Sequence, residues 1–359
     1  KRERRYFGNG RYCHQIDMTD DLNILLIRGG GIGDIILAIP SLYGFKKLHP
    51  DCSITFLSTW DENNKSSPIP LLYKLGLIDD HIGIPFISKP SISNYFQLFR
   101  VLFEERNKYQ ISICLRHSLR KFPSKIIDYL LFKYFLNIKV GIGFWNSSEL
   151  SRISLSGDDT YPMIQEYKRL IHVLCSEGFN IDQNNINQLI CGLIKEKIKN
   201  VSLPYNNEKD KFIVLCPFAR LDEKKWKYKN YVQLSKILVN NGKKIVIIGS
   251  HEEYDIGQTL MEDIGSLTNN LCGTLNIVEL CKLFDESEMY IGNDTGPMHV
   301  AGLLDIPSVA LFSRHSNPGK FYPMGEKIYI IRNQSSSIDS ISVDEVLKGV
   351  NSILGTNYG

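Results

Sequence analysis

Two turns in this sequence hold side chains that could do chemistry, and the more informative one is Gly292–His299. It follows a strand-like run and opens a segment with helical spacing of apolar residues. Pro297 suits the first helical position, because it lacks an N–H group that would have no partner there. Thr295 and Gly296 then offer backbone N–H groups, with the Thr295 hydroxyl, to a diphosphate at the positive end of the helix dipole. The turn therefore predicts an anion-binding helix N-terminus.

The same turn carries two further polar side chains, Asp294 and His299. Asp294 can accept hydrogen bonds from sugar hydroxyls. His299 lies one turn into the predicted helix, where a histidine is more often structural than a ligand. The Asp-Thr-Gly triplet by itself also occurs in aspartic proteases, but those are all-β proteins, and the α/β alternation of this chain argues against that class.

The second turn, Gly29–Asp34, lies between the first predicted strand and its helix. Its glycines allow positive φ angles and let main-chain N–H groups approach a ligand. The dinucleotide-binding fingerprint fails here, because its sixth position should be Gly or Ala and is Asp34. A carboxylate at a helix start repels a pyrophosphate, so Asp34 either accepts a hydrogen bond from a substrate hydroxyl or simply caps the helix. The local sequence leaves both interpretations open.

Strand-like and helix-like segments alternate along the chain, as in parallel α/β domains. A polar stretch with a proline at 201–211 predicts a linker between two such units. We therefore expect Rossmann-like domains at 22–200 and 212–340 that face one another across a cleft, an N-terminal extension at 1–21, and a C-terminal helix and tail at 341–359. Predicted strands cover 23–28, 53–58, 111–115, 139–142, 212–216, 244–248, 270–272, 288–291 and 308–312. Predicted helices cover 34–48, 123–136, 228–241, 277–284, 297–304 and 343–354.

The composition is that of a globular protein: of 359 residues, 43% are hydrophobic and 23% charged. Apolar runs are far shorter than the about 20 residues of a membrane-spanning helix, and no apolar segment follows the basic start as a signal peptide requires. The eight cysteines lack Cys-x-x-Cys spacing, so we expect reduced thiols in a cytoplasmic protein. The net charge of +3 does not indicate nucleic acid and is compatible with anionic small molecules or a membrane surface.

Four segments, taken together, are more specific than any single motif. They are Ile24–Arg28 with Gly33-Asp34 and Pro40; Lys224-Lys225-Trp226 after Cys216–Ala219; Gly249–Glu253; and Gly292–Ala301 (GNDTGPMHVA). In this order and spacing they resemble glycosyltransferase family nine, the ADP-heptose:lipopolysaccharide heptosyltransferases, over residues 22–325. The resemblance implies the GT-B fold, in which two Rossmann-like domains with parallel sheets face each other across a cleft.

The resemblance also implies an inverting glycosyltransferase that moves a heptose or related sugar from an ADP-sugar to a lipopolysaccharide core or other surface glycan. Its donor-binding residues would be Lys224, Asp294, Thr295, Gly296 and His299. Lys224 would neutralise the departing phosphate, while Trp226 would simply pack. Inversion needs one carboxylate to deprotonate the acceptor hydroxyl, and by position Asp34 is the candidate base. No metal and no cofactor besides the nucleotide sugar is expected, because a lysine and a helix dipole can do a cation's work.

The N-terminal domain would hold the acceptor, with Gly33, Arg116 and His117 as candidate contacts. Residues 116–139 contain six basic side chains and one acidic side chain, which suits an inner-core lipopolysaccharide with carboxylates and phosphates. A solvated helix face would give the same charge pattern. The expected partners are a nucleotide-sugar donor and an anionic glycolipid or glycan, with peripheral contact at the cytoplasmic face of the inner membrane and no nucleic acid.

Two other classes of function remain open. A non-catalytic sugar-nucleotide-binding protein would have the same fold, although the set Asp34, Lys224 and Asp294 argues against it. A nicotinamide-dependent oxidoreductase also uses glycine-rich turns between strand and helix, although the failed fingerprint counts against this class. The stretch Ser313–Pro323 differs from the family's common Phe-Gly-Pro-Thr version, so the sugar and the nucleotide base stay undetermined.

Overall fold

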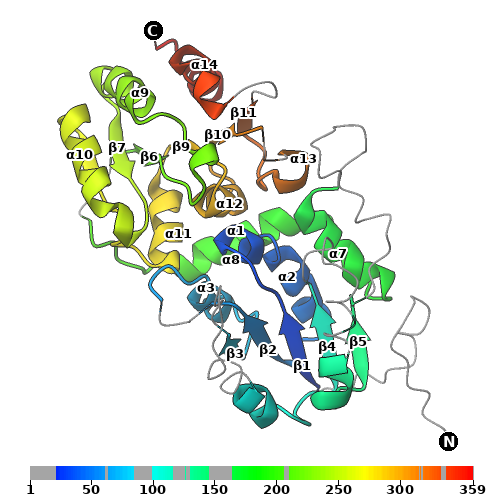
Figure 1. The fold of residues 1–359 in the computed structure, drawn as a ribbon. Coiled ribbons are helices and arrows are strands. Elements are labelled where there is room, and N and C mark those ends of the chain that lie inside the picture. Colours follow the sequence, from blue (N-terminus) through cyan, green and yellow to red (C-terminus); the bar gives the residue numbers. More distant parts are fainter. Residues whose placement is uncertain are drawn as a thin grey trace, which may run out of the picture. The chain divides into compact units, whose positions relative to one another are not determined.

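The structure is a computed structural model that describes residues 22–60, 64–84, 99–115, 126, 130–144, 164–205, 210–314, 316, 318–332 and 337–358. The described residues form two compact units (Figure 1). The first holds those up to 144 together with Ile164–Ile186, and the second holds those from Asn187 onward. Each unit is built on its own parallel β-sheet, which confirms the two-domain α/β prediction.

The first unit has a five-stranded sheet in the order β3-β2-β1-β4-β5, and all neighbouring strands are parallel. Its strands are β1 (Asn23–Ile27), β2 (Ser53–Ser58), β3 (Asp80–Gly83), β4 (Ile111–Cys114) and β5 (Val140–Ile142). Its described helical segments are α1 (Ile32–Ile36), α2 (Ile39–Leu48), α3 (Ile69–Lys74), the π-helical η2 (Leu131–Phe135) and α7 (Glu166–Ser176). The strand order switches direction between β1 and β4, where open parallel sheets bind their ligands.

The helix after β1 is interrupted, whereas the sequence predicted one continuous helix over 34–48. Two residues separate α1 from α2. Pro40, in the first turn of α2, has no N–H group and cannot donate to the Ile36 carbonyl, so a continuous helical hydrogen-bond ladder fails here. As a result α1 is a short element, and it carries Asp34 in its first turn.

The second unit has a six-stranded sheet in the order β11-β10-β9-β6-β7-β8, again with parallel neighbours. Its strands are β6 (Phe212–Cys216), β7 (Lys244–Ile247), β8 (Thr268–Asn270), β9 (Met289–Asn293), β10 (Ser308–Phe312) and β11 (Ile328–Arg332). Its described helices are α8 (Ile186–Ile198), α9 (Tyr228–Asn240), α10 (Tyr254–Ile264), α11 (Ile277–Glu286), α12 (Gly296–Leu303), α13 (Pro318–Phe321) and α14 (Val343–Leu354). Three 3-10 turns are η3 (Asp222–Lys224), η4 (His251–Glu253) and η5 (Ile338–Ser340). Here the strand order switches between β6 and β9.

Helix α8 belongs to the second unit, although the sequence analysis assigned its residues to the N-terminal domain. Cys191 Sγ lies 3.2 Å from the Leu304 carbonyl oxygen, and Lys195 pairs with Asp285 at 3.6 Å. These contacts join α8 to α11 and to the end of α12. The boundary between the two compact units falls between Ile186 and Asn187, at the first residue of α8, whereas the expected linker lay at 201–211.

The C-terminal helix α14 packs on the second unit, as the spacing of its apolar residues predicted. It contacts α9, β10 and β11, and Val346 and Val350 on its apolar face are fully buried. Ser342 caps the helix, because its hydroxyl oxygen accepts the Glu345 N–H at 3.2 Å.

Candidate functional site

The turn after β9 leads into the N-terminus of α12 in the second unit. Thr295, the residue before the helix, has extended backbone angles (φ −142°, ψ 176°), and Pro297 lies in the first turn. The Thr295 hydroxyl donates to the Asn293 carbonyl at 3.3 Å and makes no capping bond to the helix. Because its own side chain leaves the first-turn N–H groups uncapped, this helix start is suited to an anion.

Asn293, the last residue of β9, fixes the loop that follows β6. Its side chain is fully buried. The Nδ2 group donates to the Pro217 carbonyl at 2.9 Å, while Oδ1 accepts from the Trp226 N–H at 3.3 Å and from the Tyr231 hydroxyl at 3.0 Å. Burial raises the pKa of the Tyr231 phenol well above its usual range, so it stays a donor. Asn293 was not among the predicted site residues, because its only local signal is its place directly before Asp294.

Gly292 allows β9 to lie close to β6 at this point. A Cβ atom there would overlap Tyr290 Oη and would lie 2.7 Å from the Cys216 carbonyl oxygen. Cys216 and Gly292 are paired in the register of the two strands. The glycine therefore brings together the loops after β6 and β9, which carry the predicted donor residues.

Lys224 and Asp294, from those two loops, form an ion pair beside the start of α12. Lys224 Nζ lies 2.6 Å from Asp294 Oδ2, and the lysine side chain is 25% exposed against 5% for the aspartate. The neighbouring Lys225 instead pairs with Asp222, whose side chain is almost fully exposed, at 2.8 Å. The structure thus separates the two adjacent lysines and joins Lys224 to the predicted donor turn.

The remaining residues of this region are buried. His299 is 4% exposed on α12. Trp226 packs edge-on against Tyr231 with 4.9 Å between the ring centroids, and its Nε1 donates to the Ile341 carbonyl at 2.8 Å. These contacts agree with the expected packing role of Trp226.

In the first unit, the Asp34 carboxylate uses one oxygen for each of two interactions. Oδ2 accepts the Gly31 N–H at 2.9 Å, and Oδ1 lies 3.3 Å from Arg28 Nη2. The side chain is nevertheless 22% exposed. Asp34 therefore caps α1 and still presents its carboxylate to solvent, so the two roles that the sequence left open are compatible. Gly33 precedes it within the same short helix.

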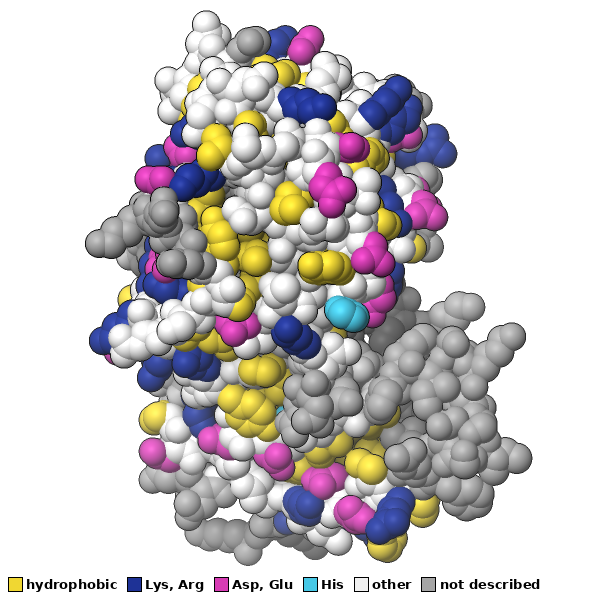
Figure 2. Space-filling view, turned by 90° about the vertical axis from the view of Figure 1, so that its left-hand side faces the viewer, with side chains coloured by type: hydrophobic (Ala, Val, Ile, Leu, Met, Phe, Trp, Pro, Cys, Tyr) yellow, Lys and Arg dark blue, Asp and Glu magenta, His cyan; other side chains and the backbone are white. Residues whose placement is uncertain are grey.

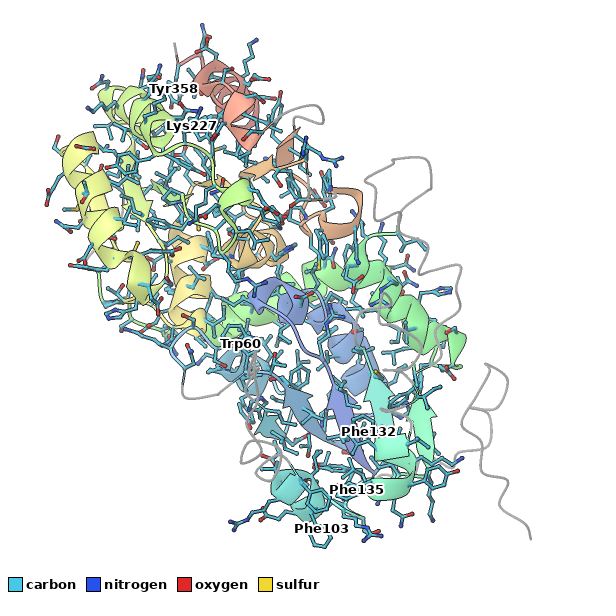
Figure 3. The ribbon with its side chains drawn as sticks, viewed as in Figure 1. Trp60, Phe103, Phe132, Phe135, Lys227 and Tyr358 are labelled. Atoms are coloured by element: carbon cyan, nitrogen blue, oxygen red, sulfur yellow. The ribbon has the colours of Figure 1, made fainter. Side chains whose placement is uncertain are left out.

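Gly30 leaves room for this carboxylate. Its φ is +123°, and a Cβ atom there would overlap Asp34 Oδ2. Its carbonyl accepts a hydrogen bond at 3.0 Å from Nε1 of Trp60, which is labelled in Figure 3 and follows β2. The absence of a side chain at Gly30 is therefore what allows the Asp34 carboxylate to occupy this position.

Three buried charged side chains, Arg28, Glu166 and Arg169, form a cluster that contacts Asp34 through Arg28. Arg28, fully buried, donates through Nε to the Asp34 carbonyl at 3.2 Å and through Nη1 to the Leu115 carbonyl. Both Nη atoms lie 3.3 Å from Glu166 Oε1, and Glu166 accepts two hydrogen bonds from Arg169, at 2.7 and 2.8 Å. Burial lowers the pKa of the Arg28 guanidinium, while the Glu166 and Asp34 carboxylates raise it. This cluster could not be predicted from local sequence, because Arg28 and Glu166 are 138 residues apart.

Other predictions fall partly outside the described residues. Arg116 and His117 lie outside them, as do residues 1–21 and most of the basic segment 116–139.

Over the described ranges, no group of three or more His, Cys, Asp or Glu side chains could hold a metal ion. Within the same ranges, no helix is both long and apolar enough to cross a membrane. Figure 2 shows basic and acidic side chains interspersed over one face.

Comparisons with known proteins identify the family. The model of glycosyltransferase family 9 (heptosyltransferase) matches residues 131–350. The chain is 32% identical over 125 residues to lipopolysaccharide heptosyltransferase 2 of Salmonella typhimurium, a match that covers 33% of this chain and only 36% of that protein. It is 24% identical over 332 residues to lipooligosaccharide heptosyltransferase 2 of Haemophilus influenzae, covering 87% of this chain and 88% of that protein.

The fold is also that of a solved structure, E. coli ADP-heptose LPS heptosyltransferase II. The TM-score is 0.64 at 20% sequence identity, and the alignment covers 93% of this chain and 98% of the E. coli chain. This likeness confirms the GT-B fold, with its two parallel-sheet α/β domains. With more than half of its length matched by the family model, this chain belongs to glycosyltransferase family 9.

Proposed function

We propose that this protein transfers a heptose from ADP-heptose to a lipopolysaccharide core acceptor, with inversion at the anomeric carbon and without a metal ion. Family membership supports glycosyl transfer, and the relatives' names support heptose and lipopolysaccharide. The name of the E. coli structure supports ADP-heptose as donor. The observation that carries the proposal is the Lys224–Asp294 pair at the uncapped start of α12.

The donor half of the proposal uses charges that are already in position. The diphosphate accepts hydrogen bonds from the Thr295 and Gly296 N–H groups, where the helix dipole favours negative charge. Lys224, held beside them by Asp294, contacts the phosphate that leaves and neutralises its developing charge. Asp294 accepts hydrogen bonds from sugar hydroxyls, and His299 supports the donor from within the first turn of α12. A fixed ammonium group and a helix dipole make a metal ion unnecessary.

The acceptor half of the proposal assigns the base to Asp34. The acceptor hydroxyl oxygen forms a bond to the anomeric carbon on the face opposite the diphosphate. The bond between that carbon and the β-phosphate oxygen breaks, ADP leaves with its electron pair, and the hydroxyl proton passes to Asp34. A positioned base of this kind contributes about 10²–10⁴-fold in rate. The partial exposure of the Asp34 side chain makes such a proton transfer feasible.

Acceptor binding is assigned to Gly33, Arg116 and His117. The two side chains would pair with carboxylates or phosphates of the lipopolysaccharide core, since a guanidinium group binds such oxyanions in bidentate geometry. Because the proposed acceptor is a glycolipid, the proposal also places the protein in the cytoplasm, in peripheral contact with the cytoplasmic face of the inner membrane. The nucleotide-sugar donor and the anionic glycolipid are thus the proposed partners.

Release of ADP from ADP-heptose in the presence of core lipopolysaccharide tests the proposal. Lys224→Ala should weaken ADP binding and lower turnover, while Lys225→Ala, its neighbour with an exposed partner, should change neither. A thermal-shift panel should show stabilisation by ADP-heptose of about 2.7 kcal/mol at 100 times its dissociation constant. Binding without ADP release would favour a non-catalytic binding protein, and stabilisation by NADH instead would contradict the donor assignment.

Asp34→Asn tests the base separately. It should abolish transfer while leaving the thermal shift with ADP-heptose nearly intact, because the carboxylate acts on the acceptor and not on the donor. Unchanged turnover in this variant would remove Asp34 as the base and leave the donor assignment standing.

A further inference from the structure

Asp34 accepts hydrogen bonds from a neutral backbone group and from a charged side chain. On one side it accepts a neutral backbone N–H from Gly31 at 2.9 Å. On the other side Arg28 contacts it twice, from Nη2 to Oδ1 at 3.3 Å and from Nε to the main-chain carbonyl at 3.2 Å. Because the second contact fixes the backbone of the same residue, the guanidinium group determines both where the carboxylate lies and how it is turned.

Arg28 is itself fixed by elements far away in the sequence. It donates to the Leu115 carbonyl at the end of β4, and it shares Glu166 Oε1 with Arg169 of α7. Arg28 and Glu166 are fully buried and Arg169 is 2% exposed, so water cannot compete for these contacts. A planar guanidinium with donors committed on three sides keeps a single orientation. Its geometry is therefore imposed by the fold and not by Asp34 alone.

The cluster is also balanced in charge. Arg28, directly after β1, and Arg169 of α7 are cationic, and Asp34 of α1 and Glu166 of α7 are anionic. Loss of the Glu166 charge would leave Asp34 beside a net positive charge, which favours its ionised form. Loss of the Arg28 charge would leave only Glu166 and Arg169, whose charges cancel, so Asp34 would lose its adjacent cation, which disfavours its ionised form. The two perturbations act on the base in opposite directions.

We propose that Arg28, fixed by Glu166 and Arg169, is a positioning residue that orients the Asp34 carboxylate and sets its strength as a base. The inference rests on the proposed role of Asp34 as the base. Glu166 acts on Asp34 through Arg28. It fixes the guanidinium group by hydrogen bonds, and its negative charge offsets part of the positive potential at Asp34. A cluster with a purely structural role would serve only to join α7 to the sheet.

The test is the pH dependence of kcat for ADP release in the full-length protein. The variants are Glu166→Gln, Arg28→Gln and Arg28→Lys, with the melting temperature measured for each. Arg100→Gln and Glu104→Gln are matched controls, because they make the same charge changes in an exposed ion pair of the same unit, at 3.2 Å. KM for ADP-heptose and for the acceptor is measured alongside.

Glu166→Gln should lower kcat about 10²-fold, as expected for a shifted catalytic group, with both KM values nearly unchanged. The acidic limb of its profile should move to lower pH, and that of Arg28→Gln should move to higher pH. Arg28→Lys keeps the charge but not the planar fork, so its limb should stay near that of the unmodified protein while kcat falls. Both control variants should leave the limb and kcat unchanged.

A limb that stays in place in both Glu166→Gln and Arg28→Gln would overturn the inference, because lost folding lowers the active fraction without moving a pH profile. If Arg28→Gln fails to fold, the test is the comparison of the acidic limbs of Glu166→Gln and Glu104→Gln. Identical limbs in these two variants would then overturn the inference. Retained ADP release in Asp34→Asn is a different result, since it removes the proposed base itself. An inactive Asp34→Asn with unmoved limbs in the other variants refutes only the positioning role.

Discussion

Replacing Asn293 with alanine should separate the loop after β6 from the end of β9. Three buried groups would lose their partner: the Pro217 carbonyl, the Trp226 N–H and the Tyr231 hydroxyl. Each buried polar group left unsatisfied costs about 1–3 kcal/mol. Because water can enter the space left by the amide and serve some of these groups, we expect a loss of about 3–5 kcal/mol in the free energy of unfolding.

The same change should also weaken donor binding, since this loop carries Lys224. Asn293→Ala should therefore raise KM for ADP-heptose, while KM for the acceptor stays the same. Urea unfolding followed by circular dichroism gives the stability, and steady-state ADP release gives the kinetics. Asn241→Ala is the matched control, because Asn241 is an exposed asparagine of the same unit whose side chain donates to the Ile237 carbonyl of α9 at 2.8 Å.

Equal urea midpoints for Asn293→Ala and Asn241→Ala would refute the stabilising role of the Asn293 hydrogen bonds. A less stable Asn293→Ala with an unchanged KM for ADP-heptose would refute the link to donor binding, because the loop would then hold Lys224 without Asn293. The first result concerns the hydrogen bonds, and the second concerns their link to donor binding.

Two further predictions concern the turn around Asp34 and the buried thiols. Gly30→Ala should lose most ADP release but keep ADP binding, because its Cβ atom would displace the Asp34 carboxylate. Steady-state kinetics of ADP release measures the effect. Gly76→Ala is the control, because Gly76 also has a positive φ but has open space around its Cβ position. Burial raises the pKa of Cys216 and Cys281 to about 12, so both stay protonated in the folded chain at a pH where unfolded thiols ionise. Urea unfolding should therefore show stability falling as the pH rises above about 9, with a flatter slope in Cys281→Ala.

Local sequence was sufficient for the elements that carry the site. The strands β2, β6 and β10 have the predicted bounds, because continuous runs of apolar and β-branched residues define a buried parallel strand. The turn Gly292–His299 opens a helix with Pro297 in its first turn, as its residue types required. The short β3 and β11 were missed, since four or five residues at a sheet edge carry little periodic signal.

By itself, the sequence determined the two parallel α/β units, the glycine-rich turns and most of the residues proposed to act, because backbone conformation and burial follow from residues close together in the chain. Only the tertiary structure showed that Arg28 pairs with both Asp34 and Glu166, and that Lys224 rather than Lys225 pairs with Asp294. These pairs join residues 138 and 70 positions apart. Their contacts depend on strand order and on where each loop leaves its sheet, which no local pattern specifies.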